Sequence, residues 1–412
     1  MTRGRVILHC DLNNFYASVE CKRNPELKAY PVAVCGSVED RHGIVLAKNQ
    51  LAKAKGVITG EPVWQAKEKC PGLVVVPPNF DDYVEHSRRA REIYYRYTDR
   101  VEPMGIDECW LDVSGSVHLF GSGQKIAYEI KESIKKELGI TASVGVSFNK
   151  IFAKLGSDLK KPDAVTCIFK ETFKEQIWHL PANVMMGIGD KTYKKMHKKN
   201  IKTIGDVASC PPEILQTWFG KSGLDLWNYA NGNDQSEVAV FGESPVPKSI
   251  GHGTTTKADL KTAEEVRELI IELSQDLGNS LRKQSLSASG VAISVKDNTL
   301  ETREYRAKLP HLTQSTRIIA ESAYNLFIVK HVWKNNIRAI TVRVIDLVSG
   351  EAPEQLSIFI DYERQKKLER LEGAVDAIRE KYGSHAICSA SYLKDIKISK
   401  RDHRLPAFNS FI

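Results

Sequence analysis

Three acidic residues of this chain follow short apolar runs. Asp11 comes directly after the run Val-Ile-Leu-His-Cys at 6–10, and Asp107 and Glu108 close a second run that begins at Met104. Because short apolar runs are typical of buried strands, two such strands side by side would bring the three carboxylates to one point. Crowded carboxylates repel one another and are costly to desolvate, and a divalent cation removes that cost. Oxygen ligands suit Mg²⁺, and carboxylates around two Mg²⁺ ions are a recurrent arrangement for phosphoryl transfer.

A lone Asp-Glu pair is more often a solvated turn, so its interpretation depends on the surroundings. These include Asp-x-x-x-Phe-Tyr-Ala-Ser-Val-Glu at 11–20, Ile-Asp-Glu at 106–108 and Ser-Val-Gly-Val-Ser-x-Asn-Lys-x-x-Ala-Lys at 143–154. In these motifs, their order and their approximate spacing, the chain resembles the Y-family, or lesion-bypass, DNA polymerases. The resemblance covers essentially the whole chain and is most specific over residues 1–165. It looks closest to the bacterial polymerase IV branch, with some traits of the polymerase V catalytic subunit.

The composition sets wider bounds. A chain of 412 residues is too long for one ordinary core, so roughly two to four domains are expected. Hydrophobic residues make up 42% and charged residues 27%, as in a soluble globular protein, and the net charge of +8 only weakly favours an acidic partner. The eight cysteines include no Cys-x-x-Cys spacing, which argues against a zinc site and suits a reducing cytosol. We find neither a signal peptide nor a membrane span, so a cytoplasmic location without a membrane partner is expected.

Strand-like and helix-like stretches alternate around the three acids, which suits a ferredoxin-like α/β sheet. After about residue 171 short helices follow, and beyond a Pro-bearing linker clean β alternation returns at 291–295 and 340–344. The resemblance implies an α+β multidomain, right-hand polymerase with a ferredoxin-like palm, small fingers, a helical thumb with a helix-hairpin-helix, and an α+β little finger. The expected boundaries are palm 1–14 and 80–170, fingers 15–79, thumb 171–236, linker 237–248, little finger 249–348, and a tail 349–412 with a clamp-binding motif and a helix.

Roles for the acids follow from the resemblance. It implies that Asp11 and Asp107 bind both metal ions and that Glu108 binds the ion that activates the primer 3′ hydroxyl. The backbone carbonyl of Leu12 is implied as a further ligand. The expected cofactor is Mg²⁺, with two ions in the site, for which Mn²⁺ could substitute. The alternative is an acidic palm that no longer binds metal.

The resemblance also implies an aromatic steric gate at the pair Phe15-Tyr16. A ring beneath the sugar of the incoming nucleotide would clash with a ribose 2′ hydroxyl, so that deoxyribonucleotides are selected. Both residues are expected at the nucleotide site, with Tyr16 as the gate. The alternative is that the rings simply pack between palm and fingers.

Lysines are the expected ligands of the triphosphate. Lys161 matches a family lysine that contacts the triphosphate, although an exposed lysine before a turn would show the same pattern. In the fingers, polymerase IV relatives commonly have Thr or Ser, Tyr and Arg where this chain has Ala47, Gln50 and Lys53. Lys53 is still expected to bind the nucleotide, but a lysine cannot make the forked contacts of an arginine. These departures bear on nucleotide affinity and error pattern rather than on the reaction class.

A basic segment after the palm resembles a helix-hairpin-helix. Its Gly-Ile-Gly turn, with Gly187 and Gly189, would let backbone amides at a helix start approach a DNA phosphate. Lys191, Lys194 and Lys195 would add sequence-independent attraction. The alternative is a solvated basic helix face.

A short motif in the tail matches the bacterial sliding-clamp peptide Gln-Leu-x-Leu-Phe, apart from Ile for the second Leu. The residues predicted to bind the clamp are Gln355, Leu356, Ile358 and Phe359. Such a peptide would bury aliphatic and aromatic anchors in a preformed groove. The alternative is an ordinary strand that packs on the little finger.

The chain is therefore predicted to be a template-directed, Mg²⁺-dependent DNA polymerase, and the resemblance implies low fidelity and the ability to pass lesions. The expected partners are primer–template DNA, deoxynucleoside triphosphates (dNTPs) and the bacterial sliding clamp, and we expect a nucleoid-associated monomer. The main alternative is a catalytically weak polymerase-fold scaffold recruited to the clamp, which the changed residues at 47, 50 and 53 would favour. A nucleotidyl cyclase with a similar palm is more distant, since the thumb and little finger would have no purpose in it.

Overall fold

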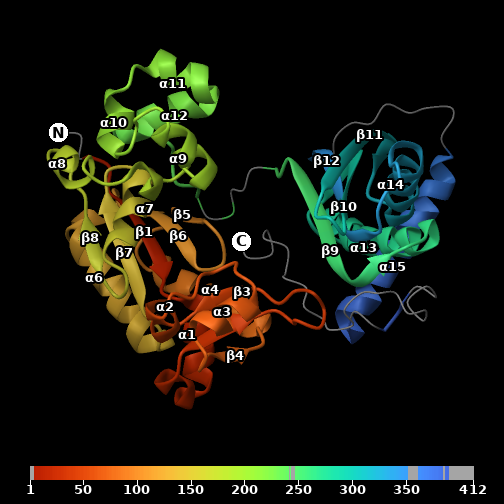
Figure 1. The fold of residues 1–412 in the computed structure, drawn as a ribbon, viewed down its shortest axis with the longest axis horizontal. Coiled ribbons are helices and arrows are strands. Elements are labelled where there is room, and N and C mark those ends of the chain that lie inside the picture. The colour runs from red at the N-terminus through yellow and green to blue at the C-terminus, as the bar shows by residue number, and fades with distance from the viewer. Residues whose placement is uncertain (1–3, 241, 243–245, 351–360, 384–385, 389–412) are drawn as a thin grey trace. The chain divides into compact units, whose positions relative to one another are not determined.

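The computed structural model of the chain describes residues 4–240, 242, 246–350, 361–383 and 386–388. The chain divides into two compact units, one mainly of residues 1–36 and 44–244 and the other mainly of 37–43 and 245–403 (Figure 1). Both units combine helices with sheets, in agreement with the predicted α+β multidomain fold class. None of the described helices is long and apolar enough to cross a membrane.

A five-stranded sheet, in the order β5-β6-β1-β7-β8, forms the centre of the first unit (Figure 1). Its strands are β5 Val101–Pro103, β6 Glu108–Asp112, β1 Ile7–Leu12, β7 Ala142–Ser147 and β8 Val165–Cys167. All six residues of β1 are buried, and this strand pairs antiparallel with both β6 and β7. The apolar run before Asp11 is thus part of a buried central strand, as predicted from its sequence.

Helices on this sheet position the side chains near the acids. They are α4 Phe80–Tyr94, the short α5 Val117–Phe120, α6 Gly123–Ser133 with a following π-helical turn Ile134–Leu138, and α7 Lys150–Leu159. Helix α7 contacts both β7 and β1. It approaches β7 so closely that a Cβ at Gly145 would lie 1.9 Å from the carbonyl oxygen of Ala153, a space that only glycine fits. This close approach holds the whole of α7, including Lys154, against the sheet.

A small three-stranded sheet, in the order β3-β2-β4, follows β1 in the sequence. It consists of β2 Val32–Cys35, β3 Val45–Lys48 and β4 Val74–Val76, with α1 Phe15–Arg23, the 3-10 turn Pro25–Ala29, α2 Gln50–Ala54 and α3 Val63–Lys69 around it. Ala33, Val45, Ala52 and Val63 belong to a buried cluster that is separate from the core of the large sheet. This insertion therefore has its own small core.

Short helices follow the large sheet along the chain. They are α8 Phe173–Ile177, the 3-10 turn Ala182–Val184, α9 Asp190–His197, α10 Ile204–Ser209, α11 Pro212–Phe219 and α12 Lys221–Ala230. They share an apolar core with α7, to which Phe152, Ile177 and Leu215 belong. The prediction of short helices after residue 171 is confirmed.

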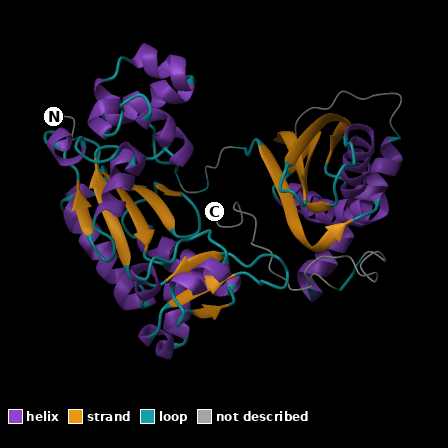
Figure 2. Cartoon of the chain, viewed as in Figure 1, coloured by secondary structure: helices purple, strands orange, loops and turns teal. Residues whose placement is uncertain are grey.

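The second unit contains a four-stranded antiparallel sheet in the order β11-β10-β12-β9 (Figure 2). Its strands are β9 Ser249–Leu260, β10 Leu286–Asp297, β11 Thr302–Thr313 and β12 Ile337–Ser349, and its helices are α13 Ala263–Lys283, α14 Thr316–Lys330 and α15 Tyr362–Tyr382. The strands predicted at 291–295 and 340–344 are the central pair, β10 and β12. Sequence patterns did not indicate the edge strands β9 and β11, because few of their residues are buried and the apolar signal is weak.

Candidate active site

Asp11, Asp107 and Glu108 lie at the adjoining ends of β1 and β6. Asp11 in β1 pairs in register with Glu108, the first residue of β6. Directly opposed residues of antiparallel strands are close neighbours on one face of a sheet. The amide of Leu12 donates to the carbonyl of Asp107 across 3.0 Å, which holds Asp107 beside the end of β1. The predicted meeting of the two strand ends is therefore confirmed.

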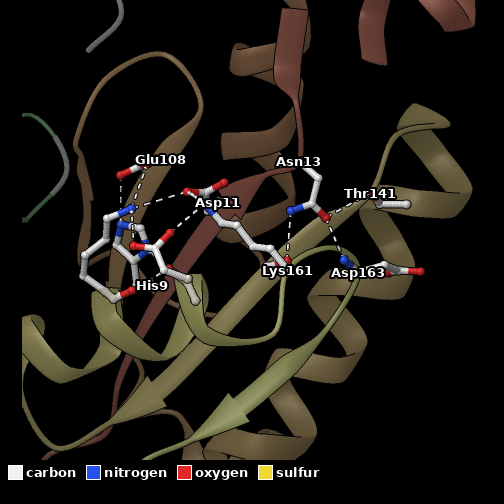
Figure 3. A network of polar contacts seen from close by, with 11 residues as sticks. His9, Asp11, Asn13, Glu108, Thr141, Lys161 and Asp163 are labelled. Atoms are coloured by element: carbon white, nitrogen blue, oxygen red, sulfur yellow. Dashed lines mark hydrogen bonds and ion pairs between the residues drawn. The ribbon is translucent and has the colours of Figure 1, made fainter. Parts of the chain in front are cut away.

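Two lysine side chains enter this acid cluster. Lys161 Nζ lies 2.6 Å from Asp11 Oδ2, and Figure 3 shows both residues in one network of polar contacts. Lys154 Nζ lies 2.9 Å from Glu108 Oε1 and 3.4 Å from Asp11 Oδ2, so that it bridges the two acids. Asp11 is only 4% exposed. These ammonium groups, rather than water, therefore stabilise most of its negative charge.

Burial and charge shift the pKa values in this cluster. Burial, together with the neighbouring Glu108, raises the pKa of Asp11 to about 7 and the pKa of Asp107 to about 6. Burial also works against the charge of Glu108, but the contacts with His9 and Lys154 outweigh it and lower the pKa of this carboxyl. Burial opposes the charge of Lys154 as well, yet Glu108 and Asp11 raise its pKa. The cluster therefore depends on nearby cations to stabilise its negative charge.

The donor set of the cluster fits a hard divalent ion. It consists of carboxylate oxygens with the backbone of Leu12 beside them, and oxygen ligands are those that Mg²⁺ prefers. A cation already bridges Asp11 and Glu108, in the form of the Lys154 ammonium. Within the described residues, no group of three or more His, Cys, Asp or Glu side chains is already arranged around a position for an ion. The Lys154 ammonium thus occupies one oxygen of each of these two carboxylates.

His9 supports Glu108 from inside the sheet, a contact that sequence patterns did not indicate. This fully buried residue has Nδ1 2.9 Å from Ser157 Oγ and Nε2 3.4 Å from Glu108 Oε2. The Ser157 hydroxyl in turn donates to the carbonyl of Lys154 across 2.7 Å. Burial lowers the pKa of His9. The sequence signal was slight, a single imidazole in the otherwise apolar run before Asp11.

Phe15 and Tyr16 have different environments at the start of α1. Phe15 is 3% exposed and belongs to the core beneath the large sheet. Tyr16 is half-buried, and its ring stacks on that of Tyr83 with centroids 4.2 Å apart and planes 9° from parallel. Burial and the charge of Asp107 raise the pKa of Tyr16. Of the two rings, Tyr16 is therefore the less buried, and the charge of Asp107 acts on its hydroxyl.

Asn13 anchors the turn that carries Lys161, another role that the sequence did not reveal. Its Oδ1 accepts hydrogen bonds from the Asp163 amide at 2.8 Å and from the Thr141 hydroxyl at 3.1 Å. Its Nδ2 donates to the Ser143 hydroxyl at 2.9 Å. Figure 3 shows the Asn13 side chain linked to Thr141 and to Asp163. The Asp163 carboxylate is held in addition by two lysines of the α6 region, so the turn is fixed from both sides.

Comparison with known proteins identifies the family of this chain. Residues 10–158 match the model of the impB/mucB/samB family, residues 247–358 match that family's C-terminal domain, and residues 184–234 match the thumb domain of DNA polymerase-iota. The chain is 54% identical to DNA polymerase IV of Acetivibrio thermocellus over 392 residues, which cover 95% of this chain and 98% of that relative. The chain belongs to the Y-family of DNA polymerases.

Further matches to this Y-family polymerase extend over nearly its whole length. DNA polymerase IV of Clostridium acetobutylicum is 33% identical over 398 residues, which cover 95% of this chain and 99% of that relative. A solved Y-family DNA polymerase chimera aligns with a TM-score of 0.73 at 24% identity, covering 84% of this chain and 99% of the chimera. At 24% identity, this similarity to the chimera shows the fold alone. The family that the motifs at 11–20, 106–108 and 143–154 predicted is therefore confirmed.

The thumb match of this polymerase covers the segment predicted as a helix-hairpin-helix. Gly187 has a φ of +90°, which favours glycine, and Gly189 is the N-cap of α9. Lys191 and Lys194 are exposed on α9, whereas Lys195 Nζ donates to a carbonyl of α11 across 2.7 Å. All three predicted lysines are thus presented to solvent, and Lys195 also ties two helices together.

Two residues of the predicted fingers, Lys53 and Ala47, stand outside the described polar network around Asp11. Lys53 is exposed on α2, and Ala47 is half-buried on β3. The predicted clamp-binding motif at 355–359 lies outside the described residues.

Proposed function

We propose that this DNA-directed polymerase extends a primer by a two-metal mechanism at Asp11, Asp107 and Glu108, in low-fidelity synthesis across damaged templates. The observation that carries the proposal is that acids from β1 and β6 meet beside two lysines. Buried acids alone would repel one another, so a cluster of this kind favours a site for cations and phosphates. Family membership favours the same reaction.

Each acid has a proposed task. Two Mg²⁺ ions, or Mn²⁺ in their place, would lower the pKa of the primer 3′ hydroxyl and neutralise the triphosphate and the leaving pyrophosphate. Asp11 and Asp107 would hold both ions, and the carbonyl of Leu12 would be a further ligand. Glu108 would bind the ion beside the primer hydroxyl, and His9 Nε2 lies 3.4 Å from its carboxylate.

The incoming dNTP would lie between Tyr16 and Lys161. The ring of Tyr16, held by its stack on Tyr83, is the proposed steric gate, and the buried Phe15 supports it from below. Lys161 would bind the triphosphate from its anchored turn. Lys53 is proposed as a second nucleotide contact from the fingers.

The domains of the polymerase and their DNA contacts are also part of the proposal. We propose the palm at 1–14 and 80–170, the fingers at 15–79, the thumb at 171–236, a linker at 237–248, the little finger at 249–348 and a tail at 349–412. Primer–template DNA would be bound without sequence preference by the Gly187–Gly189 turn and the lysines of α9. Since the named relatives are bacterial polymerases, we further propose that the chain acts at the bacterial nucleoid, as a monomer.

Primer extension by the purified chain tests the proposal against the scaffold alternative. With Mg²⁺ and four dNTPs, we expect short extension products on undamaged and on lesion-bearing templates, and none after metal chelation. Replacing Mg²⁺ by Mn²⁺ should retain synthesis. A chain that binds primer–template DNA but extends no primer would instead favour a recruitment scaffold or a requirement for another subunit.

Deletion of residues 355–359 tests the proposed clamp contact. Synthesis stimulated by the bacterial sliding clamp is expected to fall to the basal level, because the peptide would lose its aliphatic and aromatic anchors. Basal synthesis without the clamp should be unchanged. The matched control is Ser357→Ala, which changes the one position of the motif that is not an anchor. Equal loss of basal and stimulated synthesis would show that the segment is structural.

A further inference from the structure

Lys154 lies within ion-pair distance of three carboxylates. Its Nζ is 2.9 Å from Glu108 Oε1, 3.4 Å from Asp11 Oδ2 and 3.3 Å from Asp158 Oδ2. The first two acids belong to the cluster, whereas Asp158 lies one turn along the same helix, at position i+4. The Lys154 side chain is 15% exposed and that of Asp158 is 40% exposed. The three acids therefore lead from the buried cluster towards solvent.

This placement makes Lys154 a counter-ion of the cluster. A buried carboxylate without a compensating charge is costly, and Asp11 and Glu108 share this ammonium. Lys161 supplies a second positive charge, but its contacts are with Asp11 and Asp158, at 2.6 Å and 2.7 Å. Of the two lysines, Lys154 is therefore the one that pairs with both Asp11 and Glu108.

A divalent ion would compete with Lys154 for the same oxygens. Mg²⁺ binds oxygen at about 2.1 Å, so an ion that joins Asp11 to Glu108 would occupy the space beside the ammonium. Two cations so close together in a partly dry site repel strongly. The flexible four-carbon stem of a lysine allows the ammonium to move, and Asp158 is already within reach on the same helix.

We propose that Lys154 is a built-in counter-cation of the acid cluster, which a divalent ion displaces and which Asp158 then receives. This inference rests on the proposed two-metal function and adds that metal binding is an exchange of cations. Lys154 then has two effects. It holds the acids together before the metal arrives, and it makes metal binding weaker than the acids alone would make it. Asp158 becomes a positioning residue for the displaced ammonium.

The exchange predicts that Lys154→Met binds divalent ions more tightly than the wild type. Binding is measured by the electron paramagnetic resonance signal of free Mn²⁺, without DNA or nucleotide. We expect a Kd about 10- to 100-fold lower, because a unit charge close to the ion has been removed. In thermal unfolding, the variant should be less stable than the wild type in EDTA and gain more from Mn²⁺. Unchanged or weaker Mn²⁺ binding would overturn the inference.

Lys150→Met is the matched control. Lys150 lies on the same helix, is 10% exposed, and pairs with Glu102 at 2.7 Å, outside the acid cluster. This variant should lose the same stability with and without Mn²⁺ and keep the wild-type affinity. If Lys154→Met does not fold, Lys154→Gln, which keeps a polar group beside Glu108, carries the same comparison.

Asp158→Asn completes a double-mutant cycle. In the wild-type background it should weaken Mn²⁺ binding, since the displaced ammonium loses its receiving carboxylate. With Lys154→Met it should weaken binding less, because the effect through Lys161, which also pairs with Asp158, is all that remains. Equal effects in both backgrounds would remove Asp158 from the exchange. Asp107→Ala separates the cation exchange from the metal site on which it depends. If Asp107→Ala weakens Mn²⁺ binding but Lys154→Met leaves it unchanged, only the exchange is wrong, whereas wild-type Mn²⁺ affinity in Asp107→Ala refutes the proposed metal site itself.

Discussion

Replacing Asp107 by alanine is expected to abolish nucleotide incorporation and to leave DNA binding intact. Asp107 adjoins the end of β1 through the hydrogen bond from Leu12, and it is proposed to hold both metal ions. Metal ions contribute several kcal/mol to phosphoryl transfer, so we expect incorporation to slow by about a thousandfold or more. Single-turnover primer extension measures the rate, and fluorescence anisotropy of a labelled primer–template measures DNA binding.

Asp112→Asn is a suitable control for this experiment. Asp112 lies on the same strand, β6, but pairs with Ile7 at the opposite end from Glu108, and its Oδ1 accepts a hydrogen bond from the Ser114 amide. The control should extend primers at close to the wild-type rate. Full activity in Asp107→Ala would contradict the metal assignment, whereas a joint loss of activity and DNA binding would point to a folding defect.

The acid cluster could be predicted because its signals are local. Each acid follows an apolar run, such a run predicts a strand, and adjacent strands bring their ends together. The supporting contacts could not be predicted in this way. His9 and Ser157 are 148 residues apart, and Asn13 and Asp163 are 150 residues apart. These hydrogen bonds exist only because α7 and the turn after it pack against β1, and no local pattern specifies such packing.

The presence or absence of a local apolar signal also separates the strands that were predicted from those that were missed. In β10 the residues at 291–295 are almost all buried, so their apolar character marks the strand. In the edge strand β11, exposed polar residues such as Glu304, Arg306 and Lys308 alternate with half-buried ones. Arg306 pairs with Glu304 on the exposed side. Such a strand is defined by its hydrogen bonds to β10 rather than by apolar residues.

A large change in sugar selection is expected for Tyr16→Ala. The half-buried ring of Tyr16 stacks flat on Tyr83, and the charge of Asp107 raises the pKa of its hydroxyl. If this ring lies beneath the sugar, its removal makes room for a ribose 2′ hydroxyl. Pockets of this kind discriminate by about 1–3 kcal/mol, so ribonucleotide insertion should rise by about 10- to 200-fold relative to deoxyribonucleotide insertion. The measurement is kcat/KM for a ribonucleotide and its deoxy counterpart opposite the same template base.

Tyr16→Phe distinguishes the ring from its hydroxyl. This variant keeps the stack on Tyr83 and should keep the wild-type sugar discrimination, because the proposed clash is with the ring. Tyr16→Ala also leaves a gap beside Tyr83, which is expected to lower the stability of the protein. A loss of stability lowers the rate with both sugars and leaves their ratio unchanged, whereas loss of a gate changes the ratio. An unchanged ratio in Tyr16→Ala would therefore refute the gate and leave Tyr16 as a packing residue between palm and fingers.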